Sequence, residues 1–373
     1  MSNCLIIAGE KSGEEHALSF FSELKRLSPQ THFWGVGGEE LSSLGVELLY
    51  HLRDFSSMGF SEVVGKIPFY FKALNHLEAE VKKRRTKTAI LIDFQDFNLR
   101  LAKKLSSLGV QVLYYVAPQA WAWKGHRAQA LASSVHTLFT ILPFEKDWFH
   151  SRGVKQVKAI PHPLMITYKN ILNEIPQRKF KSWGNKIKIL LLPGSRRFEI
   201  SNLLPEFISA IKKLKEQHNI ETHLVRVNHV DQKYYDYFQS EIDVSYESDE
   251  LIEAMKDCHF CLAASGTVTL STGIFQLPTL VCYKSSLLNE FIFNNFIQYS
   301  GPISLTNIVQ GKVVFPEYIQ DRVNANLLAK QLHSWIEDEN QYNNLMTDLR
   351  KTRQLLTGEI FSIPEYISRV IND

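Results

Sequence analysis

The chain has 373 residues, of which 45% are hydrophobic and 22% are charged, and its formal net charge is +3. These values are typical of a globular protein that is long enough for two domains, and the charge is too small to indicate a nucleic-acid partner. No basic-then-apolar leader and no apolar run of about 18 residues occurs, so we expect neither secretion nor a membrane-spanning helix.

Four cysteines are present, and two of them form the CxxC-like pair Cys258 and Cys261. No second pair completes a zinc site, and the apolar neighbours of the pair indicate a buried strand. We therefore interpret the cysteines as reduced core thiols of a cytoplasmic protein.

The first predicted strand-to-helix turn contains polar residues. An apolar run at residues 5–9 predicts a buried strand, and apolar spacing over residues 18–27 predicts the following helix. Glu10 and Ser12 lie in the turn between them, where α/β folds bind ligands. Helix capping is an alternative role for Ser12.

A glycine-punctuated apolar segment at residues 57–65 leads into a helix with an apolar stripe from Ile67 to Val81. Basic residues flank the stripe, including the run at residues 82–85. Basic residues beside exposed aromatic rings can hold an anionic membrane surface or an acylated substrate. A helix that packs its stripe on the core explains the pattern equally well.

The next predicted strand, at residues 89–92, is followed by Asp93 and Asp96. Carboxylates at the carboxyl end of a strand are candidates for a general base. Their spacing is not a metal-binding DxD, and no histidine is close enough in the sequence to indicate a metal. We expect one of the two to cap the helix that begins near Leu99.

A further strand, at residues 112–116, runs into a loop that carries Trp121 and Trp123. These rings could line an acceptor site or seal the core of the domain. Residues 138–145 are expected to form the last strand of this half. The alternation of strands and helices predicts a doubly wound parallel sheet.

The second half begins after residues 166–185, which are polar and are interpreted as a linker. Residues 187–192 predict a buried parallel strand, Gly194 a tight turn, and Arg196 and Arg197 the start of a helix. Backbone N–H groups at a helix N-terminus and guanidinium groups suit a diphosphate. The alternative is an ordinary strand-to-helix connection with two solvated arginines.

A second glycine-containing turn, at residues 265–267, follows the predicted strand at residues 260–264. It should meet the turn at Gly194 on the same sheet edge, and two converging helix N-termini make a stronger anion site than one. A strand at residues 279–283, an apolar helix around residues 291–296, two polar loops and two closing helices complete the chain. Two Rossmann-like halves whose ligand edges face each other across a cleft predict the glycosyltransferase B (GT-B) fold.

Nine motifs in order resemble those of lipid-A-disaccharide synthase, an inverting glycosyltransferase of family 19 with this fold. They are AGEKSGE, MGFSEVVG, IDFQDFN, YYVAPQAWAWK, LPFEK, LLLPGSRRFEI, ASGTVTL, SLTNIVQG and FPEYIQ. The resemblance runs nearly from end to end. It implies condensation of UDP-2,3-diacylglucosamine with 2,3-diacylglucosamine 1-phosphate (lipid X), giving lipid A disaccharide 1-phosphate and UDP.

The resemblance also implies roles for individual residues. Asp93 would deprotonate the acceptor 6-hydroxyl, Glu10 would belong to the same catalytic group, and Arg196 would stabilise the UDP leaving group. The expected substrate-binding residues are Ser12, Met58, Asp96, Trp121, Ser195, Arg197, Glu199, Ser265, Gly266, Thr267, Ser271, Asn307, Glu317 and Gln320. No metal and no cofactor is expected, because Arg196 and helix N-termini can take the place of a cation.

The same resemblance implies a domain plan and a cellular place. Residues 1–165 would bind the acceptor and lipid, with a C-terminal helix at about 350–373 packing back on them, and residues 186–349 would bind the UDP-sugar. The protein would be peripheral on the cytoplasmic face of the inner membrane of a Gram-negative bacterium, without a nucleic-acid partner. Family members that exchange C-terminal segments suggest a homodimer.

One departure from the family pattern leaves alternatives open. Ser271 stands where the family usually has a glutamate that would hold the ribose hydroxyls, and a serine cannot make that bidentate contact. Another UDP-sugar enzyme of this fold, such as a MurG-like transferase or an epimerase, is one alternative, although the glycine-rich first loop of MurG is missing. A weakened, membrane-associated nucleotide-sugar-binding protein is another. A nicotinamide dehydrogenase is disfavoured because the first strand is not followed by GxGxxG.

Overall fold

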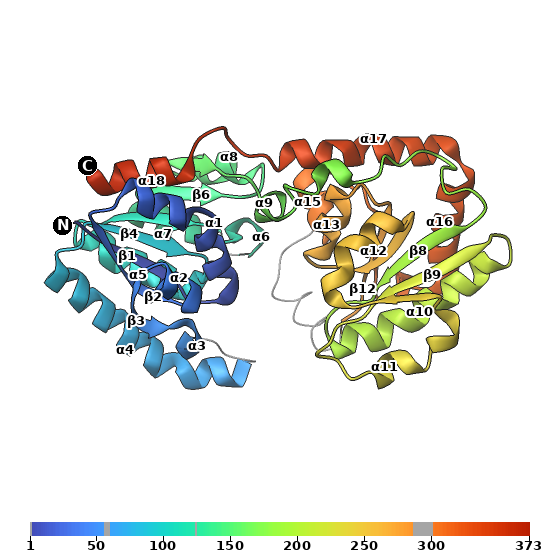
Figure 1. The fold of residues 1–373 in the computed structure, drawn as a ribbon, viewed down its shortest axis with the longest axis horizontal. Helices are drawn as coiled ribbons and strands as arrows, with labels where there is room; N and C mark the ends of the chain where they lie inside the picture. Colours follow the sequence, from blue (N-terminus) through green and yellow to red (C-terminus); the bar gives the residue numbers. More distant parts are fainter. Residues whose placement is uncertain (1, 56–59, 124, 286–300) are drawn as a thin grey trace. The chain divides into compact units, whose positions relative to one another are not determined.

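The computed structural model describes residues 2–55, 60–123, 125–285 and 301–373, with only the backbone described at residues 60–64, 122 and 123. The chain divides into two compact units (Figure 1). The first unit comprises residues 1–166 and 356–373, and the second comprises residues 167–355. Each unit is described below by itself.

The first unit is built on a seven-stranded parallel sheet in the order β3-β2-β1-β4-β5-β6-β7. Its strands are β1 (Ser2–Ala8), β2 (Thr31–Gly37), β3 (Glu47–His51), β4 (Thr88–Ile92), β5 (Gln111–Tyr115), β6 (Thr137–Thr140) and β7 (Val157–Ala159). Its helices are α1 (Lys11–Leu27), α2 (Glu39–Ser43), α3 (Leu52–Phe55), α4 (Phe60–Arg84), α5 (Gln95–Ser107), α6 (Ala120–Trp123), α7 (Arg127–Ser134), α8 (Glu145–His150) and the C-terminal α18 (Ile363–Asn372). The short helix α9 (Pro163–Thr167) lies where the chain leaves this unit.

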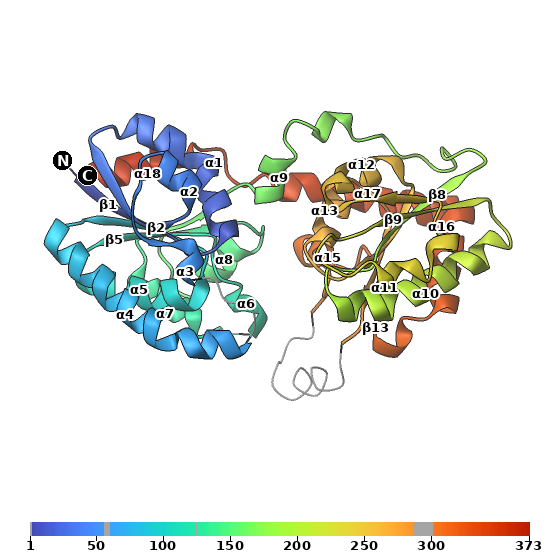
Figure 2. The same cartoon turned by 60° about the horizontal axis from the view of Figure 1, so that its bottom comes forward.

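Alternating side chains of the central strands pack on opposite faces of this sheet, as expected for buried parallel strands. On β1, Leu5 and Ile7 join the core that also contains residues of α4, α5 and α7. Ile6 and Ala8 instead join the core that contains residues of α1 and α18. Figure 2 shows α4, α5 and α7 on one side of the sheet and α1 and α18 on the other.

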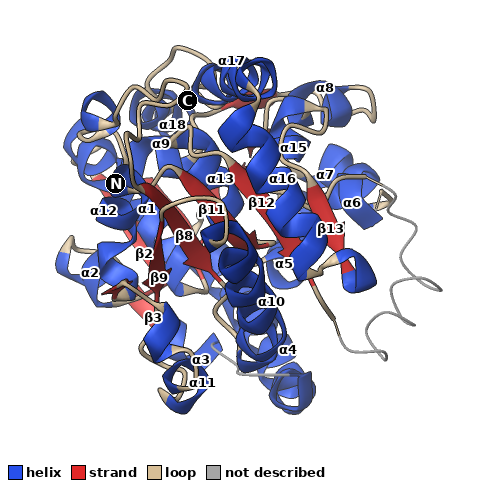
Figure 3. Cartoon of the chain, turned by 90° about the vertical axis from the view of Figure 1, so that its right-hand side faces the viewer, coloured by secondary structure: helices blue, strands red, loops and turns tan. Residues whose placement is uncertain are grey.

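The second unit has a six-stranded parallel sheet in the order β10-β9-β8-β11-β12-β13. Its strands are β8 (Ile187–Leu192), β9 (Ile220–Val225), β10 (Val244–Tyr246), β11 (Phe260–Ala264), β12 (Thr279–Tyr283) and β13 (Glu317–Ile319). Its helices are α10 (Arg197–Lys215), α11 (Lys233–Asp236), α12 (Leu251–Asp257), α13 (Val268–Ile274), α15 (Leu305–Gln310), α16 (Ala325–Glu337) and α17 (Glu339–Leu355). Figure 3 shows helices on both sides of the strands, which confirms the predicted doubly wound parallel sheets.

The structure differs from the sequence predictions at several elements. The strand expected at residues 138–145 ends at Thr140, and the short strands β3 and β7 were not predicted. Residues 166–185 contain anchored side chains, because Trp183 belongs to the core of the second unit and Arg178 is buried. The chain returns to the first unit at Leu356, and α18 is the helix that packs there. The helix expected around residues 291–296 lies outside the described residues.

Among the helices of the described ranges, none combines the length and the apolar character that crossing a membrane requires.

Candidate functional site

In both units the strand order reverses direction beside the first strand, between β1 and β4 and between β8 and β11. Ligands of open α/β sheets bind outside the carboxyl ends of the strands at such a point. The turns after these strands contain Glu10 and Asp93 in the first unit, and the segments at residues 194–196 and 265–267 in the second. The sheet topology therefore selects the same turns that the motifs indicated.

Asp93 is held at the end of β4 in an unusual backbone conformation. Its φ angle is 47° and that of Phe94 is 46°, both in the left-handed region that residues other than glycine rarely occupy. The carbonyl oxygen of Asp93 accepts hydrogen bonds from Asn98 Nδ2 at 2.8 Å and from Tyr114 Oη at 3.1 Å. Its N–H donates to the carbonyl of Tyr115 at 2.9 Å. Strain of this kind costs on the order of 1–3 kcal/mol and is typical of functional sites.

The surroundings of Asp93 favour a proton-accepting carboxylate. Burial raises its pKa, and the nearby His16 and a backbone N–H of Phe94 partly oppose that rise. Burial and the charge of Asp93 also raise the pKa of Glu10, while burial lowers the pKa of His16. A base whose pKa is raised towards neutrality is better matched to proton transfer than an ordinary carboxylate.

His16, near Asp93, and His162, near His16, were not selected from the sequence. His16 lies on α1 beyond the first ligand turn, and His162 lies between two prolines after β7. Burial and the proximity of His16 lower the pKa of His162 to about 4, so this ring is neutral at physiological pH. Its Nδ1 accepts a hydrogen bond from the N–H of Leu164 at 3.2 Å. The position of His16 one turn into the helix that follows the first ligand turn is the signal that could have indicated this histidine.

The structure gives Asp96 an internal partner. Asp96 is exposed in the first turn of α5, where its carboxylate forms an ion pair with the buried guanidinium of Arg127. Arg127 Nη1 also donates to Gln95 Oε1 at 2.7 Å. One of Asp93 and Asp96 was expected to cap a helix that begins near Leu99, but α5 begins at Gln95 and its N-cap residue is Phe94, without a side-chain cap hydrogen bond. Ser12, in the first turn of α1, is exposed at the same sheet edge.

Trp121 is anchored by a buried carboxylate. Its indole N–H donates to Glu145 Oε1 at 2.9 Å, and its ring lies edge-on to Phe144 at 5.1 Å. Glu145 Oε2 accepts from the N–H groups of Ile141 at 3.2 Å and Leu142 at 3.1 Å. Burial nevertheless raises the pKa of Glu145 to about 7. This carboxylate turns the chain after Thr140, which is why the predicted strand stops there.

The apolar stripe of helix α4 is partly buried in the core and partly exposed. Leu74 and Leu77 are buried in the core of the first unit, whereas Ile67 and Phe71 are 44% and 49% exposed. The guanidinium of Arg100 lies 5.5 Å from the centre of the Phe71 ring. Met58, which was expected to bind substrate, lies outside the described residues.

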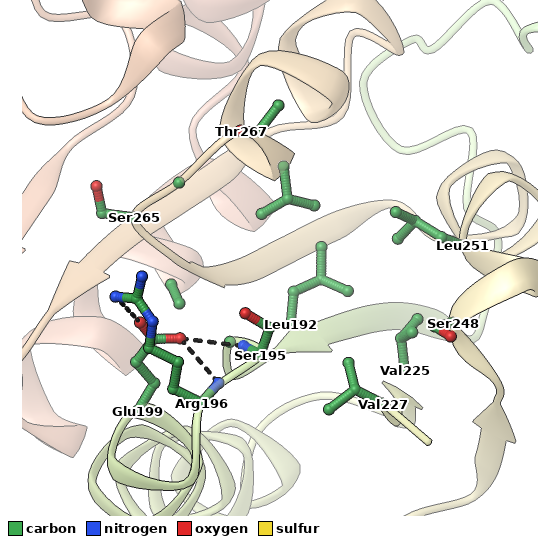
Figure 4. Close-up of a pocket in the computed structure, with 14 residues that line it drawn as sticks. Leu192, Ser195, Arg196, Glu199, Val225, Val227, Ser248, Leu251, Ser265 and Thr267 are labelled. Atoms are coloured by element: carbon green, nitrogen blue, oxygen red, sulfur yellow. Dashed lines mark hydrogen bonds and ion pairs between the residues drawn. The ribbon is translucent and has the colours of Figure 1, made fainter. Parts of the chain in front are cut away.

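The second unit contains a cavity of about 430 Å³ at the carboxyl ends of β8 and β11 (Figure 4). It is lined by Leu192, Gly194, Ser195, Arg196, Glu199, Val225, Val227, Ser248, Leu251, Ala264, Ser265, Gly266, Thr267 and Val268. One wall is apolar, and the other combines backbone N–H groups, hydroxyls, a guanidinium and a carboxylate. Such a mixture suits a ligand with a flat ring at one end and an anionic group at the other.

The polar wall is formed by the start of α10. Arg196 is 82% exposed in its side chain and lies 3.4 Å from Glu199 Oε1, while Glu199 Oε2 accepts from the N–H groups of Ser195 at 3.0 Å and Arg196 at 3.3 Å. His229 Nε2 lies 2.8 Å from the carbonyl oxygen of Ser195. Arg197 is exposed on the first turn of α10 and does not line the cavity.

The opposite turn, Ser265-Gly266-Thr267, offers unpaired donors. Ser265 Oγ donates to the carbonyl of Ile303 at 3.0 Å, which fixes the turn. The N–H groups of Gly266 and Thr267 have no acceptor among the described residues. They line the cavity and are therefore available to an anionic ligand.

Ser271 occupies a different place from the one expected for a ribose contact. It is 3% exposed within α13, its hydroxyl lies 2.9 Å from the hydroxyl of Tyr168, and it is not among the residues that line the cavity. The structure thus places this side chain behind the Ser265-Gly266-Thr267 turn.

Three expected binding residues of the late part of the chain, Asn307, Glu317 and Gln320, have partners within the protein. Asn307 is fully buried, and its amide bonds Val314 N, Phe315 N and O and Glu317 Oε1 at 2.7–2.8 Å. Glu317 Oε1 also accepts from the N–H groups of Ile303 and Ser304. Gln320 Oε1 accepts from the N–H of Ser285 at 2.8 Å. The contacts of Asn307 and Glu317 hold residues 303–307 against residues 314–317, and the contact of Gln320 joins the ends of β12 and β13.

The described residues contain no group of three or more His, Cys, Asp or Glu side chains that could hold a metal ion. All four cysteines are buried and unpaired, and burial raises the pKa of each thiol.

Comparison with known proteins identifies the family. The family model described as lipid-A-disaccharide synthetase matches residues 4–371. The chain is 33% identical over 346 residues to the lipid-A-disaccharide synthase of Myxococcus xanthus, covering 89% of this chain and 88% of that protein. It is 30% identical over 362 residues to lipid-A-disaccharide synthase 1 of Legionella pneumophila strain Paris, covering 96% and 94%.

Solved structures share the fold at low sequence identity. UDP-GlcNAc 2-epimerase from Neisseria meningitidis, bound to UDP-GlcNAc, aligns with a TM-score of 0.58 at 12% identity, covering 99% of both chains. The calicheamicin glycosyltransferase CalG4 aligns with a TM-score of 0.56 at 11% identity, covering 100% of this chain and 97% of that one. These likenesses confirm the GT-B fold. The family match and the curated relatives together show that the chain belongs to the lipid-A-disaccharide synthetase family and functions in lipid A biosynthesis.

Proposed function

We propose that the protein transfers a 2,3-diacylglucosamine unit from its UDP derivative to the 6-hydroxyl of 2,3-diacylglucosamine 1-phosphate. The observation that carries the proposal is the second unit's cavity, which joins an apolar wall to anion-binding N–H groups in a chain of this family. The uracil ring would contact the wall that contains Val225, Val227 and Leu251, and the diphosphate would lie at the turns. The structural neighbour from Neisseria meningitidis binds UDP-GlcNAc, which agrees with this choice.

Asp93 would act as the general base. Its carboxylate removes the proton of the acceptor hydroxyl while that oxygen forms a bond to the anomeric carbon of the donor. The bond from that carbon to the diphosphate oxygen breaks, and its electron pair leaves with UDP. Attack opposite the leaving group inverts the α-linked donor and gives a β-1,6 linkage. The raised pKa of Asp93 and its held backbone support this role.

Arg196 would stabilise the charge that grows on the diphosphate. Its side chain is 82% exposed and has only a long contact with Glu199, so it can reach a ligand in the cavity. A guanidinium group and helix N-termini strengthen their interactions as the leaving group gains charge, which is the requirement for catalysis. We therefore propose a metal-independent transfer.

The acylated acceptor would be held by the first unit. The exposed Ile67 and Phe71 of α4, with Arg100 beside them, support contact with acyl chains or with a membrane surface. We accordingly propose peripheral association with the cytoplasmic face of the inner membrane. We propose a homodimer because family members exchange C-terminal segments. The molecular mass of the protein in solution tests this proposal.

The reaction is tested by UDP release from purified protein supplied with both monosaccharide substrates. We expect release that requires the acceptor, and Asp93→Asn should lower turnover by about 10²–10⁴-fold while UDP binding persists, because only proton removal is lost. Asp147→Asn, which removes an exposed carboxylate on α8 of the same unit, is the matched control. Release that does not need the acceptor would contradict the transferase assignment, and unchanged turnover in Asp93→Asn would contradict the base assignment.

A further inference from the structure

The start of α10 contains a feature that a simple diphosphate site would not need. The N–H groups of Ser195 and Arg196 lie in the turn that leads into α10 and line the cavity, where they could bind an anion, yet both already donate to Glu199 Oε2. The other carboxylate oxygen lies 3.4 Å from the guanidinium of Arg196 (Figure 4). Glu199 thus contacts three groups on this side of the cavity: the N–H groups of Ser195 and Arg196 and the guanidinium of Arg196.

The sequence is fitted to this arrangement at Gly194. Its φ angle is 110°, in the region that favours glycine, and a Cβ atom built there would lie 2.7 Å from the Cβ of Glu199. Only glycine lets the glutamate fold back over the turn without a clash.

The Ser265-Gly266-Thr267 turn on the other side of the cavity has N–H groups that no described side chain occupies. The N–H groups of Gly266 and Thr267 line the same cavity, but no described side chain accepts from them. A carboxylate occupies the donors on one side of the cavity, and the donors on the other side are open. An incoming diphosphate would meet the open donors at once and would have to displace Glu199 to reach the rest.

We propose that Glu199 is an internal competitor of the diphosphate. Its carboxylate holds the anion position at the start of α10 while the cavity is empty, and it must leave those N–H groups when the nucleotide binds. This inference rests on the proposed function, because it takes a nucleoside diphosphate as the ligand. Its consequence is that Glu199 weakens nucleotide binding through charge, and so favours release of UDP after transfer.

The charge effect has a definite direction. A carboxylate and a diphosphate that share one set of donors repel each other, and removal of the negative charge relieves that repulsion. A glutamine side chain keeps one oxygen that can accept from the Ser195 and Arg196 N–H groups, so Glu199→Gln retains the cap of α10. The expected effect is UDP binding about tenfold tighter in Glu199→Gln than in the unaltered protein.

The experiment is calorimetric titration of the full chain with UDP, UMP and uridine. Glu199→Gln should tighten binding of UDP and UMP and leave uridine unchanged, because uridine carries no phosphate. Glu216→Gln removes an exposed charge from the residue that follows α10 at its far end, and it should change none of the three affinities. Arg196→Ala should weaken UDP binding and shows that the assay reports on this site.

The outcomes separate the inference from the function on which it rests. Absence of UDP binding to the unaltered protein would overturn the proposed function together with the inference. UDP binding that is equal or weaker in Glu199→Gln, with Arg196→Ala still weakened, would overturn the inference alone. An equal gain for uridine would also overturn it, because the effect would then not act through the phosphates.

Discussion

At the scale of single residues, the contact between Ser271 and Tyr168 supports a structural role for Ser271, whereas the sequence suggested a nucleotide-binding role. Both side chains are at most 5% exposed, and their hydroxyls are 2.9 Å apart. We expect Ser271→Ala and Tyr168→Phe each to lower the free energy of unfolding by about 1 kcal/mol, the usual value of one buried hydrogen bond. UDP affinity should stay within about twofold of the unaltered protein, since neither hydroxyl lines the cavity.

Denaturant unfolding of both single variants and the double variant measures the shared bond. The two losses should not add, because either substitution removes the same interaction. A tenfold loss of UDP affinity in Ser271→Ala alone would instead restore the ribose contact that the sequence suggested.

At the scale of elements, the turn from Thr140 to Glu145 links a buried carboxyl to the loop that carries Trp121. The pKa of Glu145 is about 7 in the folded protein and 4.5 in its ordinary state. Between these values the folded protein keeps a proton that the unfolded chain has released. The contribution of Glu145 to stability is therefore expected to fall as the pH rises from about 4.5 to about 7, by on the order of 3 kcal/mol, and to level off above.

Glu145→Gln should remove that part of the pH dependence, because glutamine does not titrate in this range. The measurement is the free energy of unfolding from pH 5 to pH 8 in both proteins. Glu365→Gln, on the first turn of α18, is the control for loss of an exposed carboxylate in the same unit. An equal slope in Glu145→Gln and in the unaltered protein would show that Glu145 is not the titrating group.

The same turn shows how far the sequence could predict the fold and the site. Apolar runs predicted the long central strands and, through the turns that follow them, the sheet edge that carries Asp93 in the first unit and the sheet edge that carries Arg196 and Gly266 in the second. Period and composition could not show that Glu145 ends β6, because its partners are backbone N–H groups several residues away. They could not show that Asn307 is buried, since an amide in a polar loop looks exposed until the contacts are known.

A second kind of information was missing from the sequence for a different reason. The placement of His16 near Asp93 and of Glu199 on its own helix N-terminus depends on side-chain geometry across a turn. A capping glutamate three residues after the turn and a ligand-binding glutamate have the same sequence pattern. Only the structure separates them.

At the scale of the whole molecule, each unit has its own core, and the last helix of the chain belongs to the first one. On α18, Ile367 is fully buried in the core that contains α1, while Leu332 on α16 is fully buried in the core of the second unit. Ser368 also bonds Ser28 at 2.8 Å, and Tyr366 lies 2.9 Å from Thr137 Oγ1. The residues that complete the first unit therefore follow the whole second unit in the sequence.

This division predicts that damage to one core is felt mainly in that unit. Ile367→Ala and Leu332→Ala should each cost about 2–5 kcal/mol of stability, because each leaves a cavity in a packed core. Ile367→Ala should unfold the first unit at lower denaturant while UDP binding by the second unit persists. Leu332→Ala should do the reverse, with UDP binding lost at the earlier transition.

The measurement follows UDP binding and tryptophan fluorescence through one denaturant titration of each variant. Separate transitions would mean that the two units are stable independently of each other. In that case α18 affects turnover only by stabilising the first unit, which contains Asp93. Loss of UDP binding in step with the first unit in Ile367→Ala would show instead that the two units fold as one cooperative body, despite their separate cores.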